Sequence, residues 1–310
     1  TANDMSIIRT FNNITKKEVS IAGGKGASLG EMTNAGIPVP PGFVILSSAF
    51  NQVEAKLHIE IDAALDNVNK DDISTVDAAS EKIQAMILAA EMPNNIAKQI
   101  MDAYKKLNAP LVAVRSSATA EDSASHAWAG QLDTYLNTTK TDVLKNVKRC
   151  WASLFTSRAI FYRFEKELHD TDISVAVVVQ KMIESDVSGV VFSVHPVTQD
   201  RNQLIIEAVC GLGEAIVSGS VTPDSYIVLK NNWSLHETHI SEQTKMLVKG
   251  KKGNEWKECK HNKQKLSGKH IIELAKLVVQ IEKHYGFPVD VEWAFKNKFY
   301  ITQARPITTL

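Results

Sequence analysis

Apolar residues in the first third of the chain recur at three- and four-residue spacing. This period places them on one face of an α-helix. The positions that define it include Ile83, Ile87, Ile96 and Ile100. The pattern predicts a cap of helices over about residues 49–107. Before the cap, glycines and prolines mark the ends of elements. They predict a short helix at about residues 27–33 and a strand after the turn at residues 38–42.

The pattern changes twice further along the chain. An apolar strand at residues 111–114 is followed by a helical stretch over residues 142–168. Beyond it, the β-branched runs ISVAVVVQKMI, SGVVFSV, QLIIEAV and DSYIVLK are separated by Gly, Pro, Asn and Asp, as is typical of strands. A helix over about residues 267–285 and a final strand pair follow. We therefore expect an α+β fold with one lobe over residues 1–182 and a β-rich lobe over residues 183–310.

A lysine-rich stretch interrupts the second lobe between Lys245 and Lys265. It has no glycine-rich cradle and no interleaved aromatic residues of the kind that anion sites use. A solvated hairpin or loop is the favoured interpretation.

The final strand pair has a candidate two-residue turn. PVDVEWAF and KFYITQARPI flank Asn297 and Lys298, and such a turn would place Lys296 opposite Phe299. The residues expected on the apolar face of the first strand are Val289, Val291, Trp293 and Phe295.

The opposite face of this pair carries the clearest candidate chemistry. The same register places Glu292 opposite Gln303 and Asp290 opposite Arg305. Carboxylate and amide oxygens are ligands that Mg²⁺ prefers, and an arginine beside them suits a phosphate held by that metal. The alternative is a solvent-facing strand pair with ordinary cross-strand ion pairs. Ile301, expected on the same face, argues against full exposure.

The segment GGKGASLG resembles a phosphate loop only in part. Lys25 is followed by Gly26 where the common nucleotide loop has Ser or Thr, and the glycine spacing misses the dinucleotide pattern. Flexible glycines, a helix just beyond and a lysine at the approach could still bind an anion. A turn that only connects two elements is equally compatible with the pattern.

Arg115 ends the apolar strand LVAV and opens the loop SSATAED. This places a guanidinium at a strand terminus, where α/β folds bind ligands. The alternative is an ion pair with Glu121 or Asp122.

Composition narrows the class of protein. The chain has 310 residues, 44% of them apolar, and Lys+Arg and Asp+Glu both total 35. No net charge attracts it to nucleic acid or an anionic membrane. Its longest strongly apolar run, residues 175–179, is far shorter than the roughly 20 residues that span a bilayer. Three widely spaced cysteines and no visible secretory signal favour a reducing, cytoplasmic location.

Taken together, several segments resemble the nucleotide-binding region of phosphoenolpyruvate synthases, in the same order and over nearly the whole chain. Pyruvate phosphate dikinases and rifampicin phosphotransferases are wider relatives. The segments are GGKGASLGEMTNAGIPVPPGF, VAVRSSATAED, AGQLDTYLN, CWASLFTSRAIFYR, VVVQKMIESDVSGVVFSVHPVT, GLGEAIVSGSVTPDSYIV and DVEWAFKNKFYITQARPITTL.

The resemblance implies an ATP-grasp fold whose two lobes clamp Mg-ATP. It implies that Lys25, Arg115 and Arg305 act on the phosphates, and that Glu292 and Gln303 bind Mg²⁺ with Asp290 close by. The remaining implied nucleotide contacts are Gly130 and Thr134 near the phosphates, Gln180, Lys181, Met182 and Ile183 beside the adenine, and Glu184 at the ribose.

In full-length members of the resembled family, a histidine on a further domain carries phosphate from ATP to pyruvate, which gives phosphoenolpyruvate, AMP and phosphate. The phosphohistidine and pyruvate-binding domains are absent from these 310 residues, so turnover by them alone is not expected. The partner would be a phosphohistidine domain, in cis or in trans. Two alternatives stay open, namely the ATP-binding domain of a rifampicin phosphotransferase and a stand-alone nucleotide-binding module that acts on a partner.

Overall fold

The computed structural model describes residues 6–119, 133–168 and 173–310. It is a mixed α/β protein with antiparallel sheets, and it divides into two compact units. Unit 1 comprises Thr1–Glu31 and Pro41–Met182, and unit 2 comprises Met32–Pro40 and Ile183–Leu310. No helix within the described ranges is long and apolar enough to cross a membrane.

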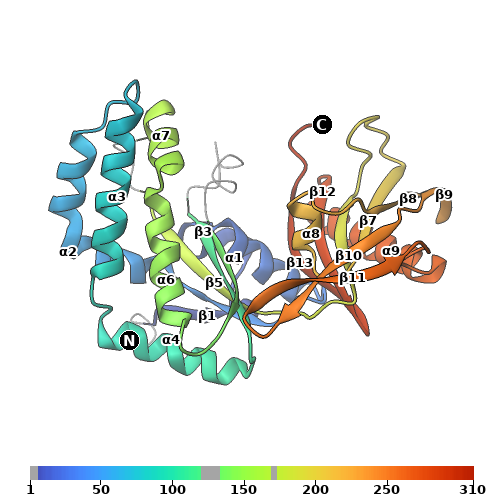
Figure 1. The fold of residues 1–310 in the computed structure, drawn as a ribbon, viewed down its shortest axis with the longest axis horizontal. Helices are drawn as coiled ribbons and strands as arrows, with labels where there is room; N and C mark the ends of the chain where they lie inside the picture. The colour runs from blue at the N-terminus through green and yellow to red at the C-terminus, as the bar shows by residue number, and fades with distance from the viewer. Residues whose placement is uncertain (1–5, 120–132, 169–172) are drawn as a thin grey trace. The chain divides into compact units, whose positions relative to one another are not determined.

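Unit 1 contains a five-stranded antiparallel sheet in the order β1-β2-β5-β3-β4 (Figure 1). Its strands are β1 (Ile8–Thr10), β2 (Gly42–Ile45), β3 (Val112–Ala118), β4 (Thr134–Thr138) and β5 (Val175–Lys181). Every residue of β3 is buried. β3 has a partner strand on each side, and apart from Arg115 its sequence VAVRSSA consists of apolar and small residues.

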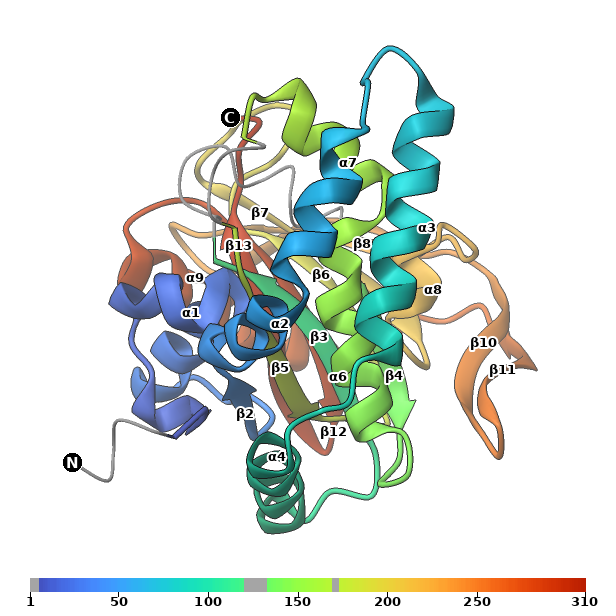
Figure 2. The same cartoon turned by 90° about the vertical axis from the view of Figure 1, so that its left-hand side faces the viewer.

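Three helices occupy the stretch with helical periodicity, and they confirm that part of the pattern. They are α2 (Ser47–Asp66), α3 (Ile73–Ala89) and α4 (Asn94–Leu107). Figure 2 shows α2 and α3 running beside α6 (Val143–Ala152) and α7 (Ser157–Glu165). One face of the sheet packs against these helices, with Val112, Val114, Val177, Val179 and Trp151 in the shared core.

The helical stretch expected over residues 142–168 is present, but it consists of two helices and not of one continuous helix. The chain passes from α6 into a 3₁₀ turn, η4 (Ser153–Phe155), and then leaves helical geometry at Thr156, with φ −64° and ψ 158°. The hydroxyl of Thr156 accepts from the N–H of Ala159 at 3.2 Å. Thr156 therefore caps a new helix, α7, instead of continuing the old one.

Unit 2 is built on a six-stranded antiparallel sheet in the order β13-β12-β6-β7-β8-β9. Its strands are β6 (Val187–Phe192), β7 (Gln203–Cys210), β8 (Asp224–Leu229), β9 (Ser234–His239), β12 (Val289–Lys296) and β13 (Lys298–Pro306). The short helix α8 (Glu214–Val217) follows β7. The lysine-rich stretch forms a separate hairpin of β10 (Gln243–Gly250) and β11 (Gly253–His261), as its pattern predicts.

Helix α9 (Gly268–Tyr285) covers one face of the unit 2 sheet. Ser267 caps it by accepting from the N–H of His270, and Gly286 ends it at a φ of 79°. Its buried side chains are Ile271, Leu274, Ala275, Val278, Val279 and Ile281. This stripe at three- and four-residue spacing agrees with the predicted helix over residues 267–285 and forces the facing strand positions to be apolar.

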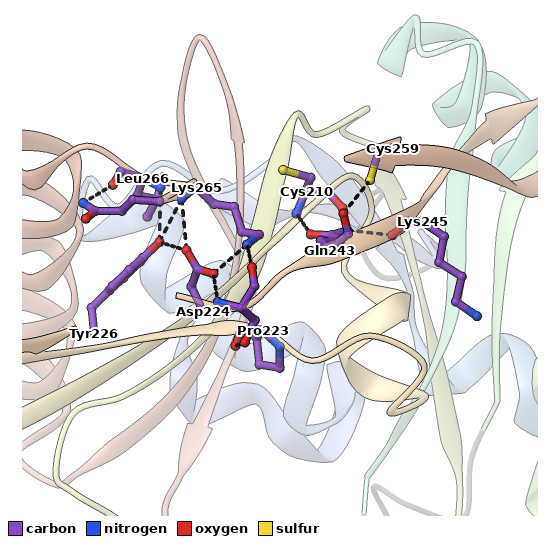
Figure 3. Close-up of polar contacts among 11 residues, drawn as sticks. Cys210, Pro223, Asp224, Tyr226, Gln243, Lys245, Cys259, Lys265 and Leu266 are labelled. Atoms are coloured by element: carbon purple, nitrogen blue, oxygen red, sulfur yellow. Dashed lines mark hydrogen bonds and ion pairs between the residues drawn. The ribbon is translucent and has the colours of Figure 1, made fainter. Parts of the chain in front are cut away.

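A fully buried ion pair joins the segment before α9 to the start of β8 (Figure 3). The Nζ atom of Lys265 donates to Oδ1 of Asp224 at 2.6 Å and to the carbonyl oxygen of Ser241 at 2.7 Å. The second carboxylate oxygen accepts from the Tyr226 hydroxyl at 2.6 Å and from the N–H of Lys265 at 3.0 Å. Each charge is thus surrounded by hydrogen-bonding groups, as burial requires.

A second set of contacts in Figure 3 joins the β10–β11 hairpin to the main sheet. The Gln243 side chain accepts from the N–H of Cys210 at 2.9 Å and donates to its carbonyl oxygen at 3.0 Å. The Gln243 side chain thus pairs with the backbone of Cys210 as a neighbouring strand would. These two hydrogen bonds attach the start of β10 to β7.

We expect Lys265→Met to lower the free energy of unfolding by about 3–5 kcal/mol, because it leaves the Asp224 carboxylate buried without its cation. The matched control is Lys296→Met, which removes the exposed pair between Lys296 and Asp186 and should cost about 0–1 kcal/mol. Urea denaturation measures both values. Equal costs for the two variants would contradict a structural role for the buried pair.

Candidate functional site

Strands β12 and β13 pair as the sequence predicts at the candidate residues. Glu292 lies opposite Gln303 and Asp290 opposite Arg305. On its other side, β12 pairs with β6, which places Val190 beside Glu292 and Phe192 beside Asp290. The acidic residues therefore lie on a strand with partners on both sides, not on the edge of the sheet.

The expected turn is wrong, although the pairing beyond it is right. Phe299 pairs with Phe295, and the strands reverse through Asn297 alone, at a φ of 64°. The turn is thus one residue tighter than predicted. An irregularity near Thr302 then adds one residue to β13, because Trp293 pairs with Ile301 whereas Glu292 pairs with Gln303. The bulge restores the predicted register.

The tighter turn also corrects the expected position of Ile301, which lies between the turn and the bulge. Residues directly opposite each other on antiparallel strands share a face, so Ile301 lies with Trp293 on the apolar face and not with Glu292. Ile301 is fully buried. On that face, the His270 ring of α9 lies 4.7 Å from the Phe295 ring, centroid to centroid.

The polar face carries an ion pair. The Nε atom of Arg305 donates to Oδ2 of Asp290 at 3.1 Å, and the side chains are 55% and 16% exposed. The cross-strand pair that the alternative interpretation requires is therefore present. Its mostly exposed arginine could also turn toward a ligand, since an exposed pair is held by little free energy.

Sequence reasoning missed two further carboxylates near this face. Burial, and secondarily the charge of Asp290, raises the pKa of Glu207 on β7. Burial, and secondarily the charge of Glu292, raises the pKa of Glu214 on α8. Glu207 could have been found, because it is a charge within the otherwise apolar run QLIIEAVC. The pattern around Glu214 gives no comparable signal.

These groups fit a divalent cation. The carboxylate of Glu292 and the amide of Gln303 lie opposite each other on adjacent strands and offer oxygen atoms of the kind that Mg²⁺ binds, and carboxylates that repel one another lie nearby. In the part of the chain that the structure describes, Oε2 of Glu214 is buried without a hydrogen-bond partner. No cluster of three or more His, Cys, Asp or Glu among the described residues could hold a metal by itself. A Mg²⁺ ion here would need ligands from phosphate or water as well.

Lys25 lies inside a helix and not in the glycine-rich turn that the pattern suggests. Helix α1 (Val19–Asn34) runs through the whole glycine segment, with one non-helical residue, Gly23, at φ 71° and ψ 172°. The Nζ atom of Lys25 donates to the carbonyl oxygen of Ser116 on β3 at 2.9 Å. The lysine therefore lies two residues after the kink, in the first turn of the second helical segment, next to the strand that carries Arg115.

Arg115 is buried at 8% exposure, and its Nη1 atom donates to Oε1 of Gln180 at 3.2 Å. Thr134 pairs directly with Arg115 across β3 and β4, so it lies on the same face of the sheet. The structure thus brings Arg115, Thr134 and Gln180 together in unit 1. Gly130 lies outside the described residues, as do Glu121 and Asp122.

The proposed adenine contacts lie at the end of β5 and beyond it. The N–H of Lys181 donates to the carbonyl oxygen of Pro41 at 2.9 Å, and the N–H of Met182 to that of Leu111 at 3.2 Å. These two donors are already engaged, so they are not available to a purine base. Ile183 is half-buried and Glu184 is exposed.

Comparison with known proteins assigns the family. Residues 19–310 match the family model described as pyruvate phosphate dikinase, AMP/ATP-binding domain. The chain belongs to this family. The match includes Lys25, Arg115 and both strands of the β12–β13 pair, so the family's AMP/ATP-binding domain contains all the described candidate residues.

The chain is similar to archaeal phosphoenolpyruvate synthases. It is 46% identical to a probable phosphoenolpyruvate synthase of Methanocaldococcus jannaschii, over 99% of this chain and 27% of that protein. It is 41% identical to the phosphoenolpyruvate synthase of Pyrococcus furiosus, over 98% of this chain and 44% of that protein. The chain spans less than half the length of either relative.

The kink in α1 can be tested through Gly23. A Cβ atom at Gly23 would lie 2.1 Å from Oγ of Ser117 and 2.3 Å from its carbonyl oxygen, whereas Gly36, at a φ of 80°, has no atom within 4 Å of such a Cβ. We expect Gly36→Ala to cost about 1–2 kcal/mol for its left-handed backbone alone. Gly23→Ala should cost about 1–3 kcal/mol more because of the clash, as measured by urea denaturation. Similar losses of unfolding free energy for the two variants would show that Ser117 can move away from a side chain at position 23 at little cost.

Proposed function

We propose that this chain is an ATP-grasp domain that binds Mg-ATP. The observation that carries the proposal is the β12–β13 register, which pairs Glu292 with Gln303 beside the pair Asp290–Arg305 on one half-buried face. Membership of an AMP/ATP-binding family supports it. Phosphoryl transfer depends on positioning and charge neutralisation, and this residue set offers both.

In unit 2, we propose that Glu292 and Gln303 bind Mg²⁺, with Asp290 close by. The ion would neutralise charge on the ATP phosphates. Asp290 holds the guanidinium of Arg305 near the metal ligands, and on nucleotide binding Arg305 would exchange this carboxylate for a phosphate oxygen. Burial raises the pKa values of Glu207 and Glu214 near these ligands, and a bound cation would favour the charged forms that burial disfavours.

In unit 1, we propose that Lys25 and Arg115 bind phosphate oxygens of the same nucleotide, and that Gly130 and Thr134 contribute to that region. Gln180 fixes the Arg115 guanidinium through their hydrogen bond. Gln180, Lys181, Met182 and Ile183 would border the adenine. Because the N–H groups of Lys181 and Met182 are engaged, we expect their carbonyl oxygens to meet the base. Glu184 would contact the ribose.

For the full-length protein, we propose that ATP, pyruvate and water give phosphoenolpyruvate, AMP and phosphate, with one phosphoryl group passing from ATP to a histidine on another domain and then to pyruvate, and the other passing to water. The relatives named above support pyruvate as the acceptor. In this scheme, Arg305, Arg115 and Lys25 stabilise charge on the transferring phosphate and Glu292 and Gln303 hold the metal. The phosphohistidine domain is the required partner.

Calorimetry with Mg-ATP tests the proposal on the 310-residue chain. We expect saturable binding that depends on Mg²⁺, because the metal ligands and the phosphate-binding cations act on the same nucleotide. Absence of binding at millimolar nucleotide would overturn the proposed function.

Glu292→Gln should weaken Mg-ATP binding by about tenfold or more, since it removes one formal charge from the metal site. The melting temperature without ligand should change little, because the apolar face of β12 is untouched. The matched control is Glu237→Gln, on the exposed strand β9, which should bind like the parent. If Glu292→Gln also binds Mg-ATP like the parent, the pair Glu292–Gln303 is part of the sheet but does not bind the metal.

Arg305→Ala should spare metal binding more than Glu292→Gln does, because the proposed partner of Arg305 is a phosphate. We expect weaker ATP binding and slower phosphoryl transfer to a supplied phosphohistidine domain. Loss of an exposed ion pair alone would cost about 0–1 kcal/mol of stability and leave nucleotide affinity unchanged. Parent-like affinity and transfer would remove Arg305 from the site.

A further inference from the structure

The hydroxyl of Ser117 lies inside the backbone hydrogen-bond ladder of α1. In a regular helix the N–H of Gly26 would donate to the carbonyl oxygen of Ala22, four residues earlier. Instead, the N–H of Gly26 donates to Oγ of Ser117 at 3.2 Å, and the same hydroxyl donates to the oxygen of Ala22 at 2.9 Å. The Ser117 hydroxyl therefore bridges Gly26 and Ala22 with two hydrogen bonds, across sequence separations of 91 and 95 residues.

This insertion coincides with the kink in α1. Gly23 lies between the two bridged groups and is the one residue of α1 whose backbone is not helical. A side chain that enters the i→i−4 ladder is a known cause of helix kinks. Ser117 itself is fully buried, so water cannot take over the role of its hydroxyl.

The kink fixes the position of Lys25. Lys25 directly precedes Gly26, the residue that Ser117 binds, and its Nζ atom reaches the carbonyl oxygen of Ser116, the neighbour of both Ser117 and Arg115. Since β3 alternates, Ser117 and Arg115 share a face. The hydroxyl thus ties the helix carrying one proposed phosphate-binding cation to the strand carrying the other.

We propose that Ser117 is a positioning residue for ATP binding, because its hydroxyl holds the α1 kink and thereby places the ammonium group of Lys25 beside Arg115. This inference rests on the proposed function. Its physical basis is pre-organisation: a lysine side chain whose backbone is already fixed loses less freedom when it binds a phosphate. Without the hydroxyl, the N–H of Gly26 and the carbonyl oxygen of Ala22 both lose their hydrogen bond to Ser117. They then stay buried without that partner, or they bond directly to each other and straighten the helix.

The test compares Ser117→Ala with Ser80→Ala. Ser80 is an equally suitable buried serine of unit 1, since its hydroxyl donates to the carbonyl oxygen of Phe155 at 2.7 Å and accepts from Gln84 at 2.8 Å. Both variants lose one donated and one accepted hydrogen bond, and both should lower thermal stability. We expect Ser117→Ala to weaken Mg-ATP binding by about tenfold, whereas Ser80→Ala should stay within about twofold of the parent.

A double-mutant cycle with Lys25→Met shows whether Ser117 acts through Lys25. If it does, Ser117→Ala should have almost no further effect on affinity in the Lys25→Met background. Additive losses would overturn the inference, and so would a loss for Ser117→Ala no larger than that for Ser80→Ala. A parent-like affinity of Lys25→Met would overturn it as well.

Hydrogen exchange without nucleotide separates this inference from the proposed function. The amide of Gly26 should exchange faster in Ser117→Ala than in the parent, after correction for global stability, and it should be unchanged in Ser80→Ala. If the parent fails to bind Mg-ATP, the proposed function fails. If the parent binds but the Gly26 amide is equally protected in both variants, the positioning role of Ser117 fails alone.

Discussion

Burial of one sheet face against α9 is the constraint on which the candidate chemistry of unit 2 depends. A strand presents successive side chains to opposite faces, so a face that must be apolar for packing leaves the alternate positions for other uses. Along β12, Val289, Val291 and Trp293 are buried, and the residues between them are Asp290 and Glu292. The stability of the fold and the alignment of the polar residues therefore have the same origin.

The sequence predicted those elements whose signals are local. The alternation in β12, the spacing in α9 and the helices over residues 49–107 each depend on neighbours within a few residues. The register at Glu292 and Gln303 was predicted from a wrong turn, because a tighter reversal at Asn297 and a bulge near Thr302 compensate each other. Neither feature has a strong local signal.

Other features could not be predicted because their causes lie far away in the chain. The kink in α1 depends on a hydroxyl more than 90 residues later, and nothing within the glycine segment reveals that partner. The break between α6 and α7 depends on a cap at Thr156 that competes with continuous helical periodicity. Glu207 and Glu214 gain their perturbed pKa values from burial and from charges on other elements, which only the fold brings near.

The bulge near Thr302 also bears on how this hairpin can vary in length. Adding or removing one residue in a regular strand would exchange the two faces for every residue beyond the change. At the bulge, two residues of β13 face one of β12, so loss of Thr302 would leave Ile301 opposite Trp293 and Gln303 opposite Glu292. Homologous chains can therefore differ in length at this point without moving acidic side chains into the core, and sequence alignments should permit a gap there.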